Sequence, residues 1–126
     1  MIRTANAVLP VADIDAACAF VKDCLGFETI VRRDGHAYCE LGDAGVHFIN
    51  APPDADMDDP ARQLVIYMDC DDVDALWAER KQAIEQLPTS HRDAPEPRAN
   101  GQREFHLIHG PFLFIAGQPI AMDEAS

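Results

Sequence analysis

Residues 7–16 read AVLPVADIDA, an apolar run that leads directly into a helix start. The run is typical of a buried strand, and Asp13 is a good N-cap because its carboxylate accepts from the free amides of the first turn. The same arrangement returns at residues 64–75, LVIYMDCDDVDA, with Asp72 in the place of Asp13. An internal repeat of this kind predicts that the two halves of the chain are built alike.

In the first half, the helix that Asp13 opens carries its apolar residues on one stripe and ends at Gly26, which favours a left-handed stop. Three short strands are expected after it, at residues 27–33, 36–41 and 46–50. Asp34-Gly35 is a strong two-residue hairpin turn between the first two of these strands. The first half therefore reads β-α-β-β-β.

The second half has the same start, with an apolar stripe from Val73 to Leu87 and Pro88 as the helix stop. We expect a polar loop at 88–102 and strands at 103–109 and 111–117. Compared with the first half, the strand that should follow the helix directly has no clear signal in the sequence. Residues 51–62 contain three prolines and predict a linker. The prediction is one α+β domain, with module one at 5–50, the linker at 51–62 and module two at 63–120.

Composition excludes several classes of function. The chain has 126 residues and a formal net charge of −12, which argues against binding nucleic acid through a basic surface. No apolar stretch approaches the roughly 18 residues of a membrane helix, and we expect a cytoplasmic protein that does not bind a membrane. The four cysteines form no C-x-x-C pair and are interpreted as reduced thiols in or near the core.

Two β-α-β-β-β modules with D-[IV]-D-A at each helix start, and LGFE at residues 25–28, resemble the vicinal oxygen chelate superfamily. This superfamily includes glyoxalase I, extradiol dioxygenases and bleomycin-binding resistance proteins. The run GQREF at residues 101–105 is most similar to the bleomycin-resistance branch. The resemblance implies a cupped mixed sheet and a homodimer whose crevices lie between modules of different chains.

The metalloenzymes of this superfamily place His or Glu on the first and last strand of each module. The matching first-strand positions here are Asn6 and Val65, at the same distance before Asp13 and Asp72. The last-strand positions are Gly45 or His47 in module one, and Ile115 or Phe114 in module two. His47 is then the one plausible ligand, and a single imidazole makes a weak site. We therefore predict no metal, no cofactor and no catalytic residue of the metalloenzyme kind.

Without a metal, the cupped sheet would act as a binding crevice with apolar and aromatic walls and a few polar groups. Its expected wall includes Phe112. The ligand-binding candidates are Asn6, Tyr38, His47, Phe48, Tyr67, Arg103, Phe105 and Phe114. For His47 and the aromatic residues, the plainer interpretation is that they belong to the core of the sheet.

Three hypotheses about function remain open. The first is a bleomycin-resistance-like protein that sequesters a small aromatic ligand, with a cationic one favoured by the acidic charge. In the drug-binding proteins, a Trp commonly stands where this chain has Asn100, which puts bleomycin itself in question. The second is a metal-dependent enzyme of the glyoxalase or dioxygenase kind. The third is a metal-free lyase or isomerase with His47 or Glu104 as the base.

Overall fold

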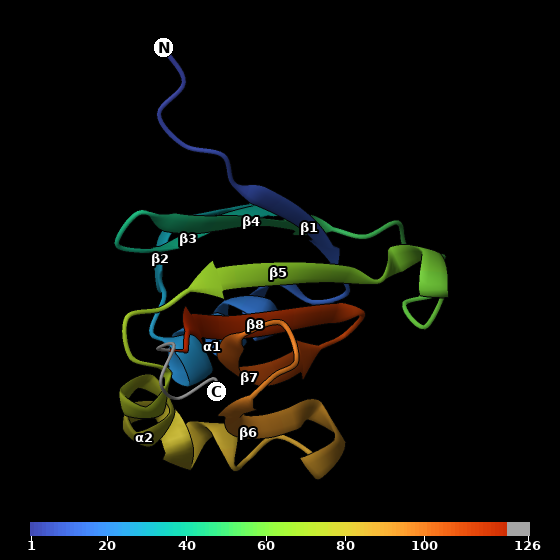
Figure 1. The fold of residues 1–126 in the computed structure, drawn as a ribbon. Coiled ribbons are helices and arrows are strands. Elements are labelled where there is room, and N and C mark those ends of the chain that lie inside the picture. The colour runs from blue at the N-terminus through green and yellow to red at the C-terminus, as the bar shows by residue number, and fades with distance from the viewer. Residues whose placement is uncertain (121–126) are drawn as a thin grey trace. The chain divides into compact units, whose positions relative to one another are not determined.

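The computed structural model describes residues 1–120, and the chain divides into two compact units, Met1–Arg62 and Gln63–Ser126. We refer to them as unit 1 and unit 2. Each unit contains one α-helix and one four-stranded mixed sheet, as Figure 1 shows. The α+β fold with two β-α-β-β-β modules is thereby confirmed.

Unit 1 follows the order predicted for the first half. Asp13 caps the helix, since its Oδ1 accepts from the amide of Ala16 at 3.1 Å, and Gly26 ends it with φ 89°. The strands lie in the order β1-β4-β3-β2, with β1 parallel to β4 and the other neighbours antiparallel. The elements are β1 (Ala7–Val11), α1 (Ile14–Leu25), β2 (Glu28–Arg33), β3 (His36–Leu41) and β4 (Ala44–Asn50).

Unit 2 repeats this topology. Asp72 accepts from the amide of Ala75 at 3.0 Å, and the strand order β5-β8-β7-β6 again has a single parallel pair, β5 with β8. The elements are β5 (Leu64–Asp69), α2 (Val73–Ile84), β6 (Arg92–Pro97), β7 (Gln102–His109) and β8 (Phe112–Pro119). A short 3-10 turn at Thr89–His91 leads into β6.

The expectation of a loop throughout residues 88–102 is wrong, because β6 occupies part of it. This strand lies at the edge of its sheet, pairs only with β7, and contains an irregularity between Asp93 and Glu96. An edge strand tolerates proline, because its outward amides have no ladder partner to lose. Pro95 and Pro97 therefore argued against a strand in the sequence analysis, although they are compatible with an edge strand in the structure.

The second helix is shorter than its apolar stripe suggested. It ends at Ile84, and the amides of Gln86 and Leu87 form tighter bonds to the carbonyls of Ala83 and Ile84. Its described residues include two that are buried, Val73 and Ile84, whereas α1 buries seven. Unit 1 thus has the more extensive helix-to-sheet core.

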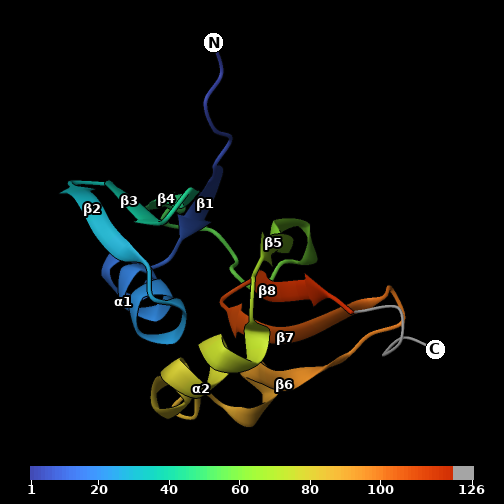
Figure 2. The same ribbon diagram turned by 60° about the vertical axis from the view of Figure 1, so that its left-hand side comes forward.

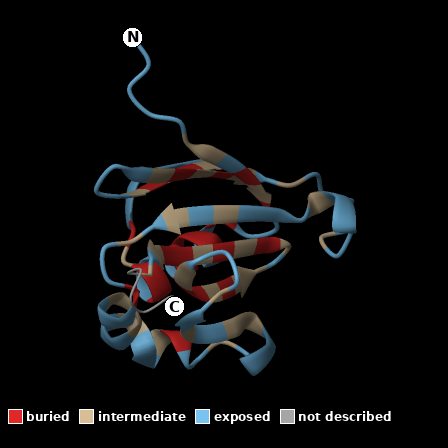
Figure 3. Cartoon of the chain, viewed as in Figure 1, coloured by how far each residue is buried: buried red, intermediate tan, exposed pale blue. Residues whose placement is uncertain are grey.

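Each sheet packs one face against the helix of its own unit. Figure 2 shows α1 against one face of the unit 1 sheet, and the burial colouring of Figure 3 places buried residues along the strands. The strand residues alternate between buried and half-exposed, as expected when one face is covered. We call the sheet face turned away from the helix of its own unit the open face.

The segment between β4 and β5 contains a 3-10 turn at Pro60–Arg62 and no strand among its described residues.

Within residues 1–120, neither helix has the length and apolar character needed to cross a membrane.

Candidate functional site

The open face of unit 1 carries the polar side chains of β3 and β4. Cys39 on β3 points toward α1, since its Sγ lies 3.6 Å from that of Cys18. Strand side chains alternate, so Tyr38 and its neighbours two positions away point to the other side. The residues of this open face that concern the site are Asn6, His36, Tyr38, Glu40, Gly45 and His47.

Two histidines of this face are hydrogen-bonded to each other. Nε2 of His36 lies 2.9 Å from Nδ1 of His47, and the ring centroids are 5.2 Å apart with 19° between the planes. Each of the two nitrogens lies on the line that joins the ring centroids, because the centroid distance is longer than the nitrogen–nitrogen distance by about the sum of the two ring radii. The two rings therefore contact each other edge to edge. One nitrogen must donate and the other accept. The facing nitrogens therefore share a proton and do not converge on a common metal position.

Tyr38 completes this cluster. Its ring centroid lies 4.7 Å from that of His47, and its hydroxyl donates to Oε2 of Glu40 at 3.1 Å. The hydrogen bond to Glu40 and partial burial raise the pKa of the Tyr38 hydroxyl. The phenol is thus held in its neutral form and in a fixed orientation.

The open face of unit 2 is defined in the same way. Phe105 on β7 contacts Trp77 of α2 edge to face, with centroids 5.3 Å apart. Glu104 and His106, on either side of Phe105 in the strand, therefore lie on the open face. Tyr67 shares this face, because its register partner Ile115 pairs in turn with His106.

Glu104 is the one charged side chain among the buried residues of the described chain, at 4% exposure. Its Oε1 lies 3.0 Å from Nε2 of His106, and its Oε2 accepts from Nδ2 of Asn100 at 3.1 Å. Burial alone would raise the pKa of this carboxyl, but hydrogen bonds from His106, Asn100 and Tyr67 together bring it below its usual value. The network thus keeps a negative charge at a fixed place.

Tyr67 extends this network to the edge strand β5. Its hydroxyl donates to Oε1 of Gln102 at 3.2 Å, and 43% of the residue is exposed. Burial of the hydroxyl end, followed by the hydrogen bond to Glu104, raises the pKa of Tyr67. Like Tyr38, it offers a neutral phenol whose polar end is tied down.

Four of the predicted wall residues lie elsewhere. Phe48, Phe105 and Phe114 are 1%, 0% and 2% exposed, and Phe112 is also buried. They belong to the face that packs on the helix, as the contact of Phe105 with Trp77 and the strand register show. The prediction that they line the open face is wrong, because the helix buries the large apolar residues and leaves the tyrosines and polar groups outside.

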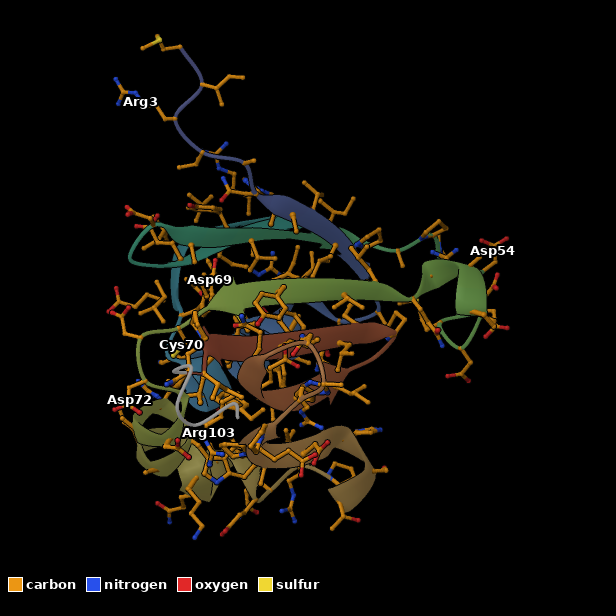
Figure 4. The ribbon with its side chains drawn as sticks, in the orientation of Figure 1. Arg3, Asp54, Asp69, Cys70, Asp72 and Arg103 are labelled. Carbon is orange, nitrogen blue, oxygen red and sulfur yellow. The ribbon has the colours of Figure 1, made fainter. Side chains whose placement is uncertain are left out.

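Arg103 also points to the helix side. Its Nε and one terminal nitrogen donate to the two carboxylate oxygens of Asp74, in the first turn of α2, at 2.8 and 2.9 Å. Figure 4 labels Arg103 and the helix cap Asp72. This bidentate pair lowers the pKa of Asp74 and joins β7 to α2, so Arg103 is a structural contact in unit 2.

The positions at which the superfamily's metalloenzymes hold their ion do not fit a metal here. Asn6 lies on the open face beside Gly45, while Val65 pairs with Leu113 on the open face of unit 2. Val65, and Ile115 or Phe114 at the other expected position of unit 2, have no electron pair to donate to a cation. In residues 1–120, no three His, Cys, Asp or Glu side chains come together in a metal-binding arrangement.

Comparison with known proteins identifies the family. The model of the Glyoxalase/Bleomycin resistance protein/Dioxygenase superfamily matches residues 3–112. The chain belongs to this superfamily. A comparison with curated proteins gives no match.

Solved structures of this superfamily share the fold. A bleomycin resistance determinant encoded on the transposon Tn5 has a TM-score of 0.76 at 23% identity, over 95% of this chain and all of that one. The bleomycin-binding protein of bleomycin-producing Streptomyces verticillus, complexed with copper(II)-bleomycin, gives 0.70 at 23%, over 96% and 99%. A lactoylglutathione lyase from Agrobacterium tumefaciens gives 0.66 at 22%, over 92% of each chain.

The structure brings together some predicted residues and adds others. On the open face of unit 1, Tyr38 lies between Asn6, with which it shares the surroundings of Gly45, and His47, while Tyr67 and Glu104 lie on the open face of unit 2. Sequence reasoning missed the roles of the polar partners, which are His36, Glu40, Asn100, Gln102 and His106. Steps of two along β3 and β7 were the available signal for His36 and Glu40 and for Gln102 and His106, because they place these residues on one face of each strand. Asn100 precedes β7 and had no such signal.

Proposed function

We propose that this member of the superfamily binds and sequesters a small aromatic ligand without changing it chemically. The observation that carries the proposal is the character of the open faces, where anchored tyrosine rings lie beside carboxylates. Binding sites commonly combine aromatic surface with a few placed polar groups. We further propose that the protein acts as a homodimer.

A cationic ligand is favoured by the electrostatics. The formal net charge is −12, and Glu40, Asp69 and Glu104 add local negative charge to the open faces. Two solved relatives are described as a bleomycin resistance determinant and a bleomycin-binding protein. Bleomycin is therefore the first ligand to test.

Metal-dependent catalysis receives no support from the donor set, since the expected ligand positions of unit 2 hold Val65 and Ile115 or Phe114, whose side chains cannot bind an ion. We propose that the ligand-binding residues are those of the predicted candidates that lie on the open faces, together with the buried carboxylate Glu104. They are Asn6, Tyr38, His47, Tyr67 and Glu104.

A second candidate is metal-free proton transfer, because Glu104 and His106 form a carboxylate-imidazole pair at 3.0 Å. A carboxylate that accepts from one ring nitrogen leaves the other nitrogen to act as a base. Such a pair would suit an isomerase or lyase acting on a carbonyl compound.

The test is titration calorimetry with bleomycin, run with and without a chelator, followed by mass spectrometry of the recovered ligand. The proposal predicts saturable binding that survives the chelator and returns unchanged bleomycin. A chemically modified product would favour the second candidate. Stoichiometric zinc, nickel, iron or manganese in the purified protein, together with loss of binding in chelator, would overturn the metal-free reading.

A further inference from the structure

A tyrosine lies against a glycine on the open face of each unit. A Cβ atom on Gly117 would be 2.7 Å from Cζ of Tyr67 and closer still to its hydroxyl oxygen. A Cβ atom on Gly45 would be 2.5 Å from the hydroxyl oxygen of Tyr38. Side chains do not approach a Cβ atom so closely, so each tyrosine needs the glycine in order to lie where it does. A glycine inside a strand otherwise weakens the strand, and it often marks such a close approach.

A glutamate stands opposite each of these glycines on the neighbouring strand. Gly45 pairs with Glu40, and Gly117 pairs with Glu104. The hydroxyl of Tyr38 donates to Glu40 at 3.1 Å, and that of Tyr67 donates to Gln102 at 3.2 Å and lies beside Glu104, which helps to raise the pKa of Tyr67. Each unit therefore contains the same three-part arrangement of tyrosine, glycine and glutamate.

The sequence repeat does not account for this likeness. Tyr38 comes from the inner strand β3, whereas Tyr67 comes from the edge strand β5. Counted from the helix caps, the unit 1 counterpart of Tyr67 is Val8, which is not aromatic. The tyrosine therefore comes from a different strand in each unit. Such an arrangement, present in both units without a shared sequence position, is expected if the anchored tyrosine ring contributes to binding.

An anchored ring is a good surface for a flat ligand. Tyrosine has few side-chain rotations to lose on binding, and here the hydroxyl is already fixed, so little ordering is left to oppose binding. The face of the ring is negative and attracts a cation, as does the adjacent carboxylate. Tyr67 is 43% exposed, in contrast with the phenylalanines on the helix side. Tyr38 is half-buried, and its ring lies against that of His47, with centroids 4.7 Å apart, so its free surface is the smaller of the two.

We propose that Tyr67 over Gly117, and Tyr38 over Gly45, are stacking platforms for flat, positively charged groups, and that the two glycines determine this specificity. The proposal deepens the proposed function and rests on it. It names the class of group that each open face takes and identifies Gly45 and Gly117 as the residues that keep the platforms open.

The experiment measures binding of proflavine, a planar cation, by fluorescence polarisation in the full chain. The variants are Gly117→Ala and Gly45→Ala, which keep the tyrosine and displace its ring, and the double variant. Leu64→Ala is the matched control, because Leu64 lies on the strand of Tyr67 but has the alternate orientation. Circular dichroism and thermal unfolding establish that each variant is folded.

We expect each glycine variant to weaken proflavine binding at its own platform about tenfold, with the double variant losing both sites and Leu64→Ala binding like the natural chain. The anionic dye 1-anilinonaphthalene-8-sulfonate should bind more weakly than proflavine to the natural chain. Tyr67→Leu replaces Gly117→Ala if that variant does not fold, since it removes the aromatic face and keeps an apolar side chain.

The outcomes separate the two proposals. If the natural chain binds bleomycin while the folded double glycine variant binds proflavine unchanged, the platforms are wrong and the binding function stands. If the natural chain binds neither bleomycin nor proflavine, the binding function fails and the platforms fail with it. Equal affinity for both dyes would overturn the cationic specificity.

Discussion

Glu104 is a carboxylate buried in a sheet, where it is hydrogen-bonded by His106 and Asn100 and lies beside the Tyr67 hydroxyl, whose one proton is shared with Gln102. Its folded-state pKa lies below its usual value, so the folded protein binds fewer protons than the unfolded chain between those two values. The stabilisation is therefore present above the ordinary glutamate pKa, near 4.3, and is lost as pH falls through the folded pKa.

We expect Glu104→Gln to lower the free energy of unfolding by about 1–3 kcal/mol at pH 7, because an amide cannot accept all of the carboxylate's hydrogen bonds. The difference should shrink as pH falls through the lowered folded-state pKa of Glu104, because the natural carboxyl then becomes protonated and loses the same bonds. Urea denaturation from pH 7 to pH 3 measures it. Glu79→Gln, whose carboxylate is 66% exposed, is the control and should change little. A Glu104→Gln difference that stays constant with pH would contradict the assignment.

The cysteines should differ in reactivity. Burial raises the pKa of the Cys39 thiol to about 11, and burial with the nearby Asp23 carboxylate raises that of Cys24 to about 11, whereas Cys70 is only half-buried. The thiolate is the reactive form, so iodoacetamide at pH 8 should modify Cys70 well before Cys24 or Cys39. Peptide mass spectrometry measures the order. Labelling in urea, where all four thiols should react alike, is the comparison, and equal labelling in the native state would refute the prediction.

Individual residues show how far the sequence could predict the site. Alternation along a strand separates its residues into two faces, but it does not say which face the helix covers. Phe105 and Glu104 are neighbours in the chain, and only the long-range contact of Phe105 with Trp77 decides their sides. Tyr38, His47 and Tyr67 could be placed on a common side of their strands, whereas the network around Glu104 depends on Asn100 in a turn whose path the sequence did not predict.

At the scale of elements, the sequence predicted the features that depend on neighbouring residues in the chain, such as the helix starts. Both helix starts follow from Asp13 and Asp72, whose side chains accept from first-turn amides. The topology follows from the repeat of these starts. The strand β6 could not be predicted, because its register comes from pairing with β7 and its own prolines argue against a strand.

The caps allow a prediction for each unit. Asp72→Ala should cost about 1 kcal/mol of stability by leaving first-turn amides of α2 without an acceptor, and Asp72→Asn should restore most of it. Hydrogen exchange should show the loss in α2 before α1, since α2 has fewer buried residues among those described. Asp13→Ala is the matched variant in unit 1 and should affect α1 instead. Equal loss of protection in both helices from either substitution would show that the caps do not act locally.

At the scale of the whole molecule, assembly and charge matter most. We expect a homodimer, and light scattering at micromolar concentration measures it directly. A monomer at that concentration would contradict the expectation. The two-unit organisation of the chain does not depend on this outcome, because each unit has its own sheet and helix.

Charge should govern how fast a cationic ligand arrives. The segment between β4 and β5 carries Asp54, Asp56, Asp58 and Asp59, and Figure 4 labels Asp54 there. Changing all four to Asn raises the formal net charge from −12 to −8. Asp56 and Asp59 accept from the amides of Asp58 and Ala61 at 3.0 Å, and an asparagine oxygen can still accept those bonds. The substitution therefore removes charge while keeping the turn.

Stopped-flow association with bleomycin then tests steering. The Asn variant should bind more slowly at low ionic strength, with a weaker dependence on salt and a nearly unchanged dissociation rate, because exposed charges direct the encounter more than they hold the complex. The four Asp→Glu changes keep the charge and should leave the association rate close to that of the natural chain. Because the Debye length falls from about 30 Å at 0.01 M salt to 3 Å at 1 M, the natural chain and the Asn variant should converge as salt rises. An association rate that ignores both salt and the four aspartates would mean that the acidity of this chain does not attract the ligand.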